Sequence, residues 1–371
     1  MVSRVDIRYH HRSHRRLLAF ELTETAEESP VDAVIVPGSR PVQWMREAMG
    51  VARGLGCALV ALCSRQVKAD EVAELGDEFG VVTVAVDVGT ADGGLPPLVT
   101  GDLLRGTPFE RTSDASMKRN VGLLLSRVAG WEQVLFLDDD IHGVSPSSAR
   151  SACGLLSRYD AVGLENAGFP DNSVVCHALR ELGGKQDQYV GSGGLAVRPC
   201  ETQSFFPNIY NEDWFFLIGD TCPPRVAVTG AMRQKEFDPF ANPDRARSEE
   251  FGDCLAEGLY WLLDYHLPLE TADEDHWKDF RRRRMRFIDH LLLGLPFHFD
   301  GKALRKRRAS LEAAKRTCEQ IEPALCVDYL NRWRDDLATW REFIDDMPVN
   351  IGVDRALDHL GIADRAHRSG S

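Results

Sequence analysis

The sequence predicts an α/β protein, with a mixed, mainly parallel, Rossmann-like sheet flanked by helices and a mostly helical C-terminal region. Three observations predict it. Short apolar runs alternate with amphipathic stretches up to about residue 86, which is typical of parallel strands joined by helical crossovers. A further apolar run ends in three aspartates, Asp138, Asp139 and Asp140. From about Ala246 onward, long helical patterns dominate.

The first part of the chain carries the alternation most clearly. We expect strands at 33–36, 58–62 and 81–86, with helices at 41–55 and 68–79 between them. Pro37-Gly38 closes the first strand, and Gly56 and Gly80 end the two helices, as glycine commonly does at helix C-termini. Strand, helix, strand in this order predicts right-handed crossovers and a parallel sheet.

The later elements follow the same reasoning. Ser113 or Asp114 is placed to cap a helix that runs to about Val128, and Ser145-Pro146 opens another toward Arg158. Strands are expected at 133–137, 161–164 and 193–197, and helices at 251–265, 277–295 and, in at least two pieces, 302–343. This predicts a lead at 1–30, a sheet domain at 31–245, a helical region at 246–364 and a disordered tail at 365–371.

Composition excludes several classes of protein. The net charge of -13 argues against a general nucleic-acid binder, because such proteins carry excess Lys and Arg. There is no apolar run long enough for a membrane span and no leader-like start. The nine cysteines include no CxxC pair, which fits reduced thiols. We therefore expect a cytoplasmic protein.

The aspartates after the apolar run 134–137 are the most informative feature. Side chains alternate along a strand, so Asp138 and Asp140 are expected to converge on one point. Two carboxylates so close need a cation, and Mg²⁺ or Mn²⁺ prefers oxygen ligands and can bridge carboxylates to a diphosphate. The alternative is an acidic turn, or a helix N-cap, after a strand.

In this context the segment 136–141 resembles the Asp-x-Asp motif of nucleotide-sugar-dependent glycosyltransferases of the GT-A fold. Three neighbouring segments match that family in order. The run 34–37 resembles the first strand, 116–123 resembles the Lys/Ala-Arg-Asn-x-Gly helix, and 211–214 resembles the Glu-Asp motif of family-two-like members. The resemblance covers roughly residues 31–240.

The resemblance implies roles for the acidic and basic residues. Asp138 and Asp140 would hold a Mn²⁺ or Mg²⁺ ion on the diphosphate of the donor, with Asp140 the more direct ligand, and Asp139 would face the sugar or the ribose. Lys118, Arg119 and Asn120 would lie near the diphosphate, where positive charge offsets the charge of the leaving group. The alternative for their helix is a solvated basic face.

The resemblance also implies a catalytic base. Asp213 would remove the proton of the acceptor hydroxyl as this attacks the anomeric carbon, and Glu212 would contact the donor. The alternative is structural, because Asn211 followed by two acids is a good N-cap and first turn for a helix through Phe216.

Two loops would complete the donor site. Gly193 and Gly194 belong to a glycine-rich stretch that in the family lies beneath the sugar, although a plain β-turn is the alternative. The segments after the first two strands are placed to meet the base and ribose of the nucleotide. Their candidate residues are Pro37, Ser39, Arg40 and Ser64. Ser64 stands where relatives often carry an acid, which puts the base specificity in doubt.

A histidine late in the fold sometimes completes the metal site of the family. The candidates are His177, His266, His276 and His298, among which we choose His266, although a lone histidine is more often no ligand. The run Arg281 to Arg284 is interpreted as the solvated side of a helix, the alternative being contact with an anionic acceptor or lipid surface.

The function that follows is transfer of a sugar from a nucleoside diphosphate sugar to a small-molecule, glycan or lipid-linked acceptor, by a chain that could form a homodimer. Two alternatives stay open. A sugar-phosphate nucleotidyltransferase uses a related sheet and a metal, and a catalytically inactive relative would bind nucleotides only.

Overall fold

The computed structural model describes residues 9–89, 94–219 and 224–370. Within them a ten-stranded sheet runs in the order β1-β9-β7-β8-β5-β2-β3-β4-β10, with β6 paired to β9. The strands are β1 (Leu18–Phe20), β2 (Ala33–Gly38), β3 (Ala58–Cys63), β4 (Thr83–Asp87), β5 (Val134–Leu137), β6 (Ile141–His142), β7 (Ala161–Asn166), β8 (Gly194–Val197), β9 (Val226–Gln234) and β10 (Ala366–Ser369).

The centre of the sheet is parallel, as the sequence predicts. Ile35 of β2 lies in register with Val60 of β3 on one side and with Phe136 of β5 on the other. Strand β8 runs antiparallel between β5 and β7. The α/β class with a mostly parallel sheet is therefore confirmed.

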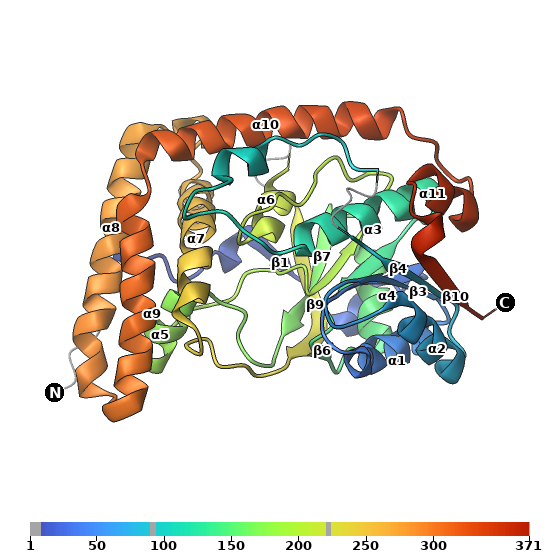
Figure 1. The fold of residues 1–371 in the computed structure, drawn as a ribbon, viewed down its shortest axis with the longest axis horizontal. Helices are drawn as coiled ribbons and strands as arrows, with labels where there is room; N and C mark the ends of the chain where they lie inside the picture. Colours follow the sequence, from blue (N-terminus) through green and yellow to red (C-terminus); the bar gives the residue numbers. More distant parts are fainter. Residues whose placement is uncertain (1–8, 90–93, 220–223, 371) are drawn as a thin grey trace.

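Helices cover both faces of the sheet (Figure 1). In β2, Ala33 and Ile35 belong to one core cluster and Val34 and Val36 to the other, because successive strand residues point to opposite faces. Helices α1 (Arg46–Leu55), α2 (Ala69–Phe79) and α4 (Pro146–Leu155) contribute to the second cluster, and α3 (Ala115–Ala129) to the first.

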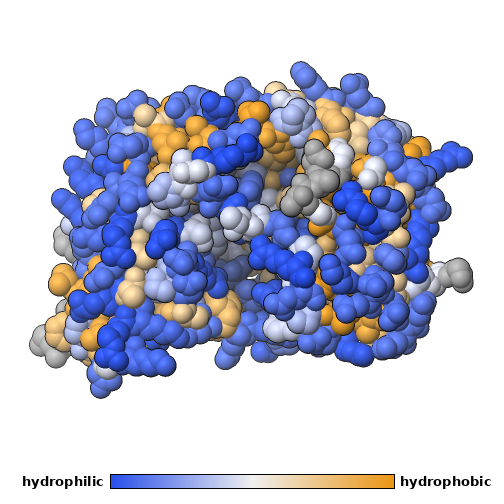
Figure 2. All heavy atoms as spheres, viewed as in Figure 1, coloured by the Kyte–Doolittle hydropathy of each residue, from blue (hydrophilic) through white to orange (hydrophobic). Residues whose placement is uncertain are grey.

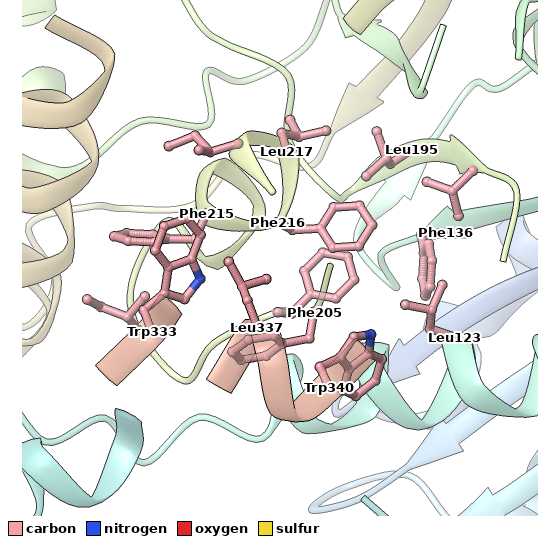
Figure 3. Close-up of a cluster of buried hydrophobic side chains, with 14 of the residues drawn as sticks. Leu123, Phe136, Leu195, Phe205, Phe215, Phe216, Leu217, Trp333, Leu337 and Trp340 are labelled. Carbon is pink, nitrogen blue, oxygen red and sulfur yellow. The ribbon is translucent and has the colours of Figure 1, made fainter. Parts of the chain in front are cut away.

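The remaining helices are α5 (Val174–Glu181), α6 (Glu212–Ile218), α7 (Pro243–Asp264), α8 (Glu274–Gly294), α9 (Gly301–Gln320), α10 (Pro323–Asp345) and α11 (Val353–His359). The predicted start of the helical region at 246 falls inside α7. Figure 3 shows how the C-terminal helices join the sheet: Trp333 of α10 packs against Phe215 of α6, and Trp340 lies beside Phe205. Phe136 of β5 lies nearby. The short helix α6 is thereby fixed between α10 and the sheet.

Both ends of the described chain contribute strands. The tail predicted to be disordered instead forms β10 over residues 366–369, antiparallel to β4, with Arg368 opposite Val84. Its pattern, Ala-His-Arg-Ser, has no apolar periodicity, and the strand forms because β4 offers an unpaired edge. The N-terminal lead supplies β1, which pairs in parallel with β9.

None of the helices in the described part of the chain combines the length and apolar character that a transmembrane span requires. The eight cysteines within these residues are all free thiols; Cys222 lies outside the described residues. Figure 2 shows a largely hydrophilic surface on the face drawn, interrupted by smaller hydrophobic patches.

Candidate functional site

The candidate site lies where the parallel strands end. Strands β2, β3 and β5 run in the same direction, so the loops after Gly38, Cys63 and Leu137 meet at one edge. The backbone N–H groups of Ser39 and Arg40 both donate to Oδ2 of Asp139, at 2.9 and 3.0 Å. Asp139 therefore holds the loop after β2 against the end of β5.

The three aspartates take different directions. Asp139 is 2% exposed and turns to that loop, whereas Asp138 and Asp140 line a cavity of about 280 Å³. Asp140 Oδ2 accepts a bond of 2.9 Å from Arg40, whose guanidinium also pairs with Asp139. The alternation expected for 138 and 140 is thus present, and Asp139 does not line the cavity.

Arg119 of α3 connects the acidic strand end to α6. Its Nη2 donates to Asp138 Oδ1 and its Nη1 to Glu212 Oε1, both at 2.7 Å. The two carboxylates raise the pKa of Arg119 although its burial opposes this. Arg111 adds a second pair to Glu212, at 3.2 Å. Arg119 is therefore a positioning group between two acids, and it also lines the cavity.

Asp213 lies on the opposite wall of the same cavity, in the first turn of α6. Its Oδ2 accepts a hydrogen bond from the backbone N–H of Ser192 and its Oδ1 one from that of Trp214, both at 3.0 Å. The predicted N-cap alternative does not describe this helix, because Asn211 makes no side-chain cap and instead adopts a left-handed conformation, φ 60°. Its amide donates to Asp253.

Gly191 opens the space beside Asp213. A Cβ at this position would lie 3.4 Å from Asp213 Oδ2 and 3.5 Å from Asp171 Oδ2. The two carboxyl groups therefore flank a point that carries no side chain. Gly193 has the same relation to Asp138, whose Oδ2 would lie 3.4 Å from such a Cβ.

Asp171 is a cavity residue that the sequence argument missed. It follows Pro170 in a loop with no motif around it, and only the fold brings it to Asp213. Asp171 as a whole residue is exposed, and it lines the cavity with its carboxyl group beside Gly191. Burial, together with the negative charges of Asp213 and Asp138, raises its pKa to about 7.

Two further carboxyl groups of the cavity also have a raised pKa. Burial and the neighbouring Asp138 raise the pKa of Asp140 to about 6, against the lowering effect of Arg40. Burial and the charge of Glu212 raise the pKa of Asp213 to about 6. The cavity therefore holds an excess of negative charge, which a cation or a proton would relieve.

The sequence-predicted residues that the cavity brings together are Arg40, Arg119, Asp138, Asp140, Gly193, Glu212 and Asp213. The other predicted residues support the walls. Lys118 is fully buried and donates to Gly38 O and Ser64 Oγ, each at 2.6 Å, so it ties the loops after β2 and β3 together. The alternative of a solvated basic face for this helix does not apply, because Lys118 and Arg119 are both buried.

Three more of the predicted donor residues have structural contacts. Asn120 exchanges two hydrogen bonds with the backbone of Phe206, at 2.9 and 2.8 Å. Gly194 faces Met232, whose sulfur would lie 2.4 Å from an added Cβ. Pro37 is a buried residue of β2. Packing and backbone hydrogen bonds thus surround these three residues, and none of them lines the acidic cavity.

His266 does not reach the acidic cavity. It adopts a left-handed conformation, φ 56°, just after α7, and it lines a separate cavity with Leu267 and Trp333. The other histidine candidates also fail to line the acidic cavity. The choice of His266 as third metal ligand is therefore not supported by the structure, since helix α7 continues past the site before this residue is reached.

The donor atoms of the cavity fit a hard divalent cation. Asp138 and Asp140 offer carboxylate oxygens, and the buried Oε1 of Gln234 at the cavity wall has no hydrogen-bond partner among the described residues. Oxygen donors of this kind suit Mg²⁺ or Mn²⁺. Gln234 comes from β9, a strand that the sequence argument did not predict.

Comparisons with known proteins add little. No family model matches the chain, and no curated protein matches its sequence. Among solved structures, a mannosyltransferase from Pyrobaculum calidifontis in complex with GDP-mannose and Mn²⁺ is similar over 91% of this chain and 89% of its own, with 12% identity and a TM-score of 0.39. This likeness is too distant to assign a family or a ligand.

Proposed function

We propose that this chain is a metal-dependent glycosyltransferase that moves a sugar from a nucleoside diphosphate sugar to a small-molecule, glycan or lipid-linked hydroxyl acceptor. The single observation that supports it is the sharing of one cavity by two groups: the carboxylates Asp138 and Asp140 at a strand end, and the half-buried Asp213 across from them. The first group suits a diphosphate-bound cation and the second suits a base.

In this proposal Asp138 and Asp140 hold the divalent cation, which neutralises the negative charge of the departing diphosphate when bound. Arg40 lines the cavity and is 44% exposed in its side chain, so it supplies a further positive charge to the phosphates. Arg119 keeps Asp138 and Glu212 in place. Lys118 fixes the loops on which a nucleotide would rest.

Asp213 acts as the base. It accepts the proton of the acceptor hydroxyl, whose oxygen attacks the anomeric carbon while the bond from that carbon to the diphosphate oxygen breaks. The raised pKa of Asp213, about 6, makes it a stronger base than an ordinary carboxylate while it stays ionised at pH 7. Gly191 leaves room for the hydroxyl beside it. A single displacement of this kind inverts the anomeric configuration.

The test begins with calorimetry of UDP and GDP, with and without Mn²⁺, followed by nucleotide release from a panel of UDP- and GDP-linked sugars. We expect metal-dependent binding, and its loss in Asp140→Ala. Asp279→Ala is the control, because that carboxylate is exposed and paired only with Arg282 in the described structure. Circular dichroism checks that both variants fold.

Three results would decide against the proposal. Unchanged turnover in Asp140→Ala contradicts the metal site. Release of pyrophosphate instead of a nucleoside diphosphate identifies a nucleotidyltransferase. Absence of metal-dependent binding of either nucleotide favours a non-catalytic relative.

A further inference from the structure

A second cluster of potential metal ligands lies beside the acidic cavity and takes no part in the proposed reaction. His10, Cys176 and Glu257 each offer one ligand atom, and these atoms lie within 4.8 Å of one another. The three residues are 8%, 2% and 3% exposed. They come from the N-terminal segment, from α5 and from α7. We propose that they form a site for a thiophilic divalent cation, Zn²⁺ in particular.

The chemistry of the trio selects this cation. Imidazole nitrogen, thiolate sulfur and carboxylate oxygen are the ligands of Zn²⁺, whereas Mg²⁺ and Mn²⁺ prefer sites made of oxygen. A Cys176 thiolate and a Glu257 carboxylate together carry the two negative charges that neutralise the ion. Binding releases the thiol proton of Cys176 to solvent, so affinity rises with pH.

The surroundings of each ligand already orient it. Phe287 stacks on the His10 ring with centroids 4.2 Å apart and planes 3° from parallel, and the His10 Nε2 bonds to Gln186 Oε1. Glu257 Oε2 accepts from His14 Nε2 at 3.2 Å. Metal sites commonly show such partners behind the ligands, which fix their direction.

The cation has a path to the site and an effect on the fold. Cys176 and Glu257 line the acidic cavity, so the ion can enter from there and its fourth position can hold water. Tetrahedral ligands at zinc distances lie roughly 3.5 Å apart, and the ligand atoms of the trio lie within 4.8 Å of one another, so binding requires them to approach by little more than an ångström at most. Closure ties the N-terminal segment carrying His10 to α5 and α7.

A neighbouring set, His11, His14 and Asp264, also brings one ligand atom of each residue within 4.8 Å of the others. Both ring nitrogens of His14 are already engaged, however, Nδ1 with Asp264 and Nε2 with Glu257. Neither nitrogen is free to bind a cation. The site is therefore assigned to the first trio alone.

The test uses Co²⁺ as a coloured substitute for Zn²⁺ on chelator-treated full-length protein. We expect a near-ultraviolet thiolate-to-Co²⁺ charge-transfer band that one equivalent of Zn²⁺ removes and that Mg²⁺ or Mn²⁺ leaves unchanged. Cys176→Ser abolishes the band. Cys57→Ser retains it, since that partly exposed thiol lies outside the trio. Absence of the band, or its persistence in Cys176→Ser, overturns the proposal.

If Cys176→Ser fails to fold, other variants and a proteolysis experiment test the site instead. His10→Ala removes one ligand together with its ring contact to Phe287 and should weaken Co²⁺ binding at least tenfold, while Gln186→Ala should weaken it about 10- to 100-fold. Zn²⁺ should also slow tryptic cleavage after the exposed Arg12 and Arg16. Unchanged affinity in His10→Ala contradicts the site. Because nucleotide binding with Mn²⁺ is read separately, this inference stands or falls independently of the proposed transferase.

Discussion

The acidic cavity carries two groups of carboxylates whose charges are compensated differently. In one group, at the end of β5 and in the first turn of α6, burial and crowding raise the pKa values of Asp140 and Asp213 to about 6. In the other group, on α7, burial would also raise the pKa of Glu257, yet the hydrogen bonds and charge of His14 lower it to about 2. His14 has the same lowering effect on Asp264.

The difference shows which acids lack a buried, directly paired cation among the described residues. Asp213 accepts hydrogen bonds from the backbone N–H groups of Ser192 and Trp214, and Asp140 pairs with the half-exposed Arg40. Burial and neighbouring acids raise the pKa of both, so that a proton or a metal ion stabilises them. These two acids are therefore assigned to the proposed reaction, and four predictions test how they differ from the compensated acids of α7.

The largest effect is expected for Asp213→Asn. An amide cannot accept the acceptor proton, so transfer should fall about 10²- to 10⁴-fold, while calorimetry should show unchanged nucleotide affinity. The measurement is the initial rate of nucleotide release at saturating donor. A rate within twofold of the parent protein would remove Asp213 from the mechanism.

Arg284→Ala tests the compensated acids of α7, Glu250 and Asp253. Arg284 is 3% exposed and bonds to both Glu250 and Asp253, so its removal leaves two buried acids without their cation. The free energy of unfolding should fall by about 3–5 kcal/mol, as measured by urea denaturation. Arg282→Ala is the matched control: its pair with Asp279 is exposed and should cost less than about 1 kcal/mol. Equal effects would contradict the distinction.

Gly191→Ala probes the space between Asp213 and Asp171. The new methyl group meets both carboxyl groups at ordinary contact distances, so the protein should fold normally. It occupies the position assigned to the acceptor hydroxyl, and kcat/KM should fall about 10- to 100-fold. Gly50→Ala, with open space around its Cβ in α1, should leave the rate unchanged. An unaffected rate in Gly191→Ala would place the acceptor elsewhere.

The smallest effect is the acid limb of the pH profile. Asp213 works only when deprotonated, so kcat/KM should rise with pH, reach half its plateau near pH 6 and be about tenfold below the plateau at pH 5. The contribution of Asp213 to folding stability changes with pH in the opposite direction to the rate. Its raised pKa contributes stability below about pH 4, and this contribution is lost as the pH rises through 6. A flat rate profile from pH 5 to 8 would contradict the role.

Much of the fold could be predicted because its strands and helices depend on residues that are close together along the chain. Apolar runs such as 134–137 and the glycines that end α1 and α2 fix strands and helices through nearby residues. Strands β1, β6, β9 and β10 were not predicted. Three of them, β1, β6 and β10, have only two to four residues without strong periodicity, and such segments become strands only when a neighbouring strand supplies hydrogen bonds.

The residues of the candidate site also divide into those that the sequence predicted and those that it missed. Asp138, Asp140 and Asp213 could be found because each stands in a short segment with its chemistry adjacent in sequence. Asp171 and Gln234 could not, since each reaches the cavity from a loop or strand that carries no motif. His266 was chosen by residue type alone, and the path of α7 carries it to another cavity.

By itself the sequence determined the α/β class, the central parallel strands and the acidic strand end, because these depend on periodicity and on residues close along the chain. The tertiary structure alone decided which charges are balanced. Arg119, Lys118, His14 and Arg284 are all basic in the sequence, yet each is buried against partners from other elements. Charge compensation depends on distance in space, which residue order does not encode.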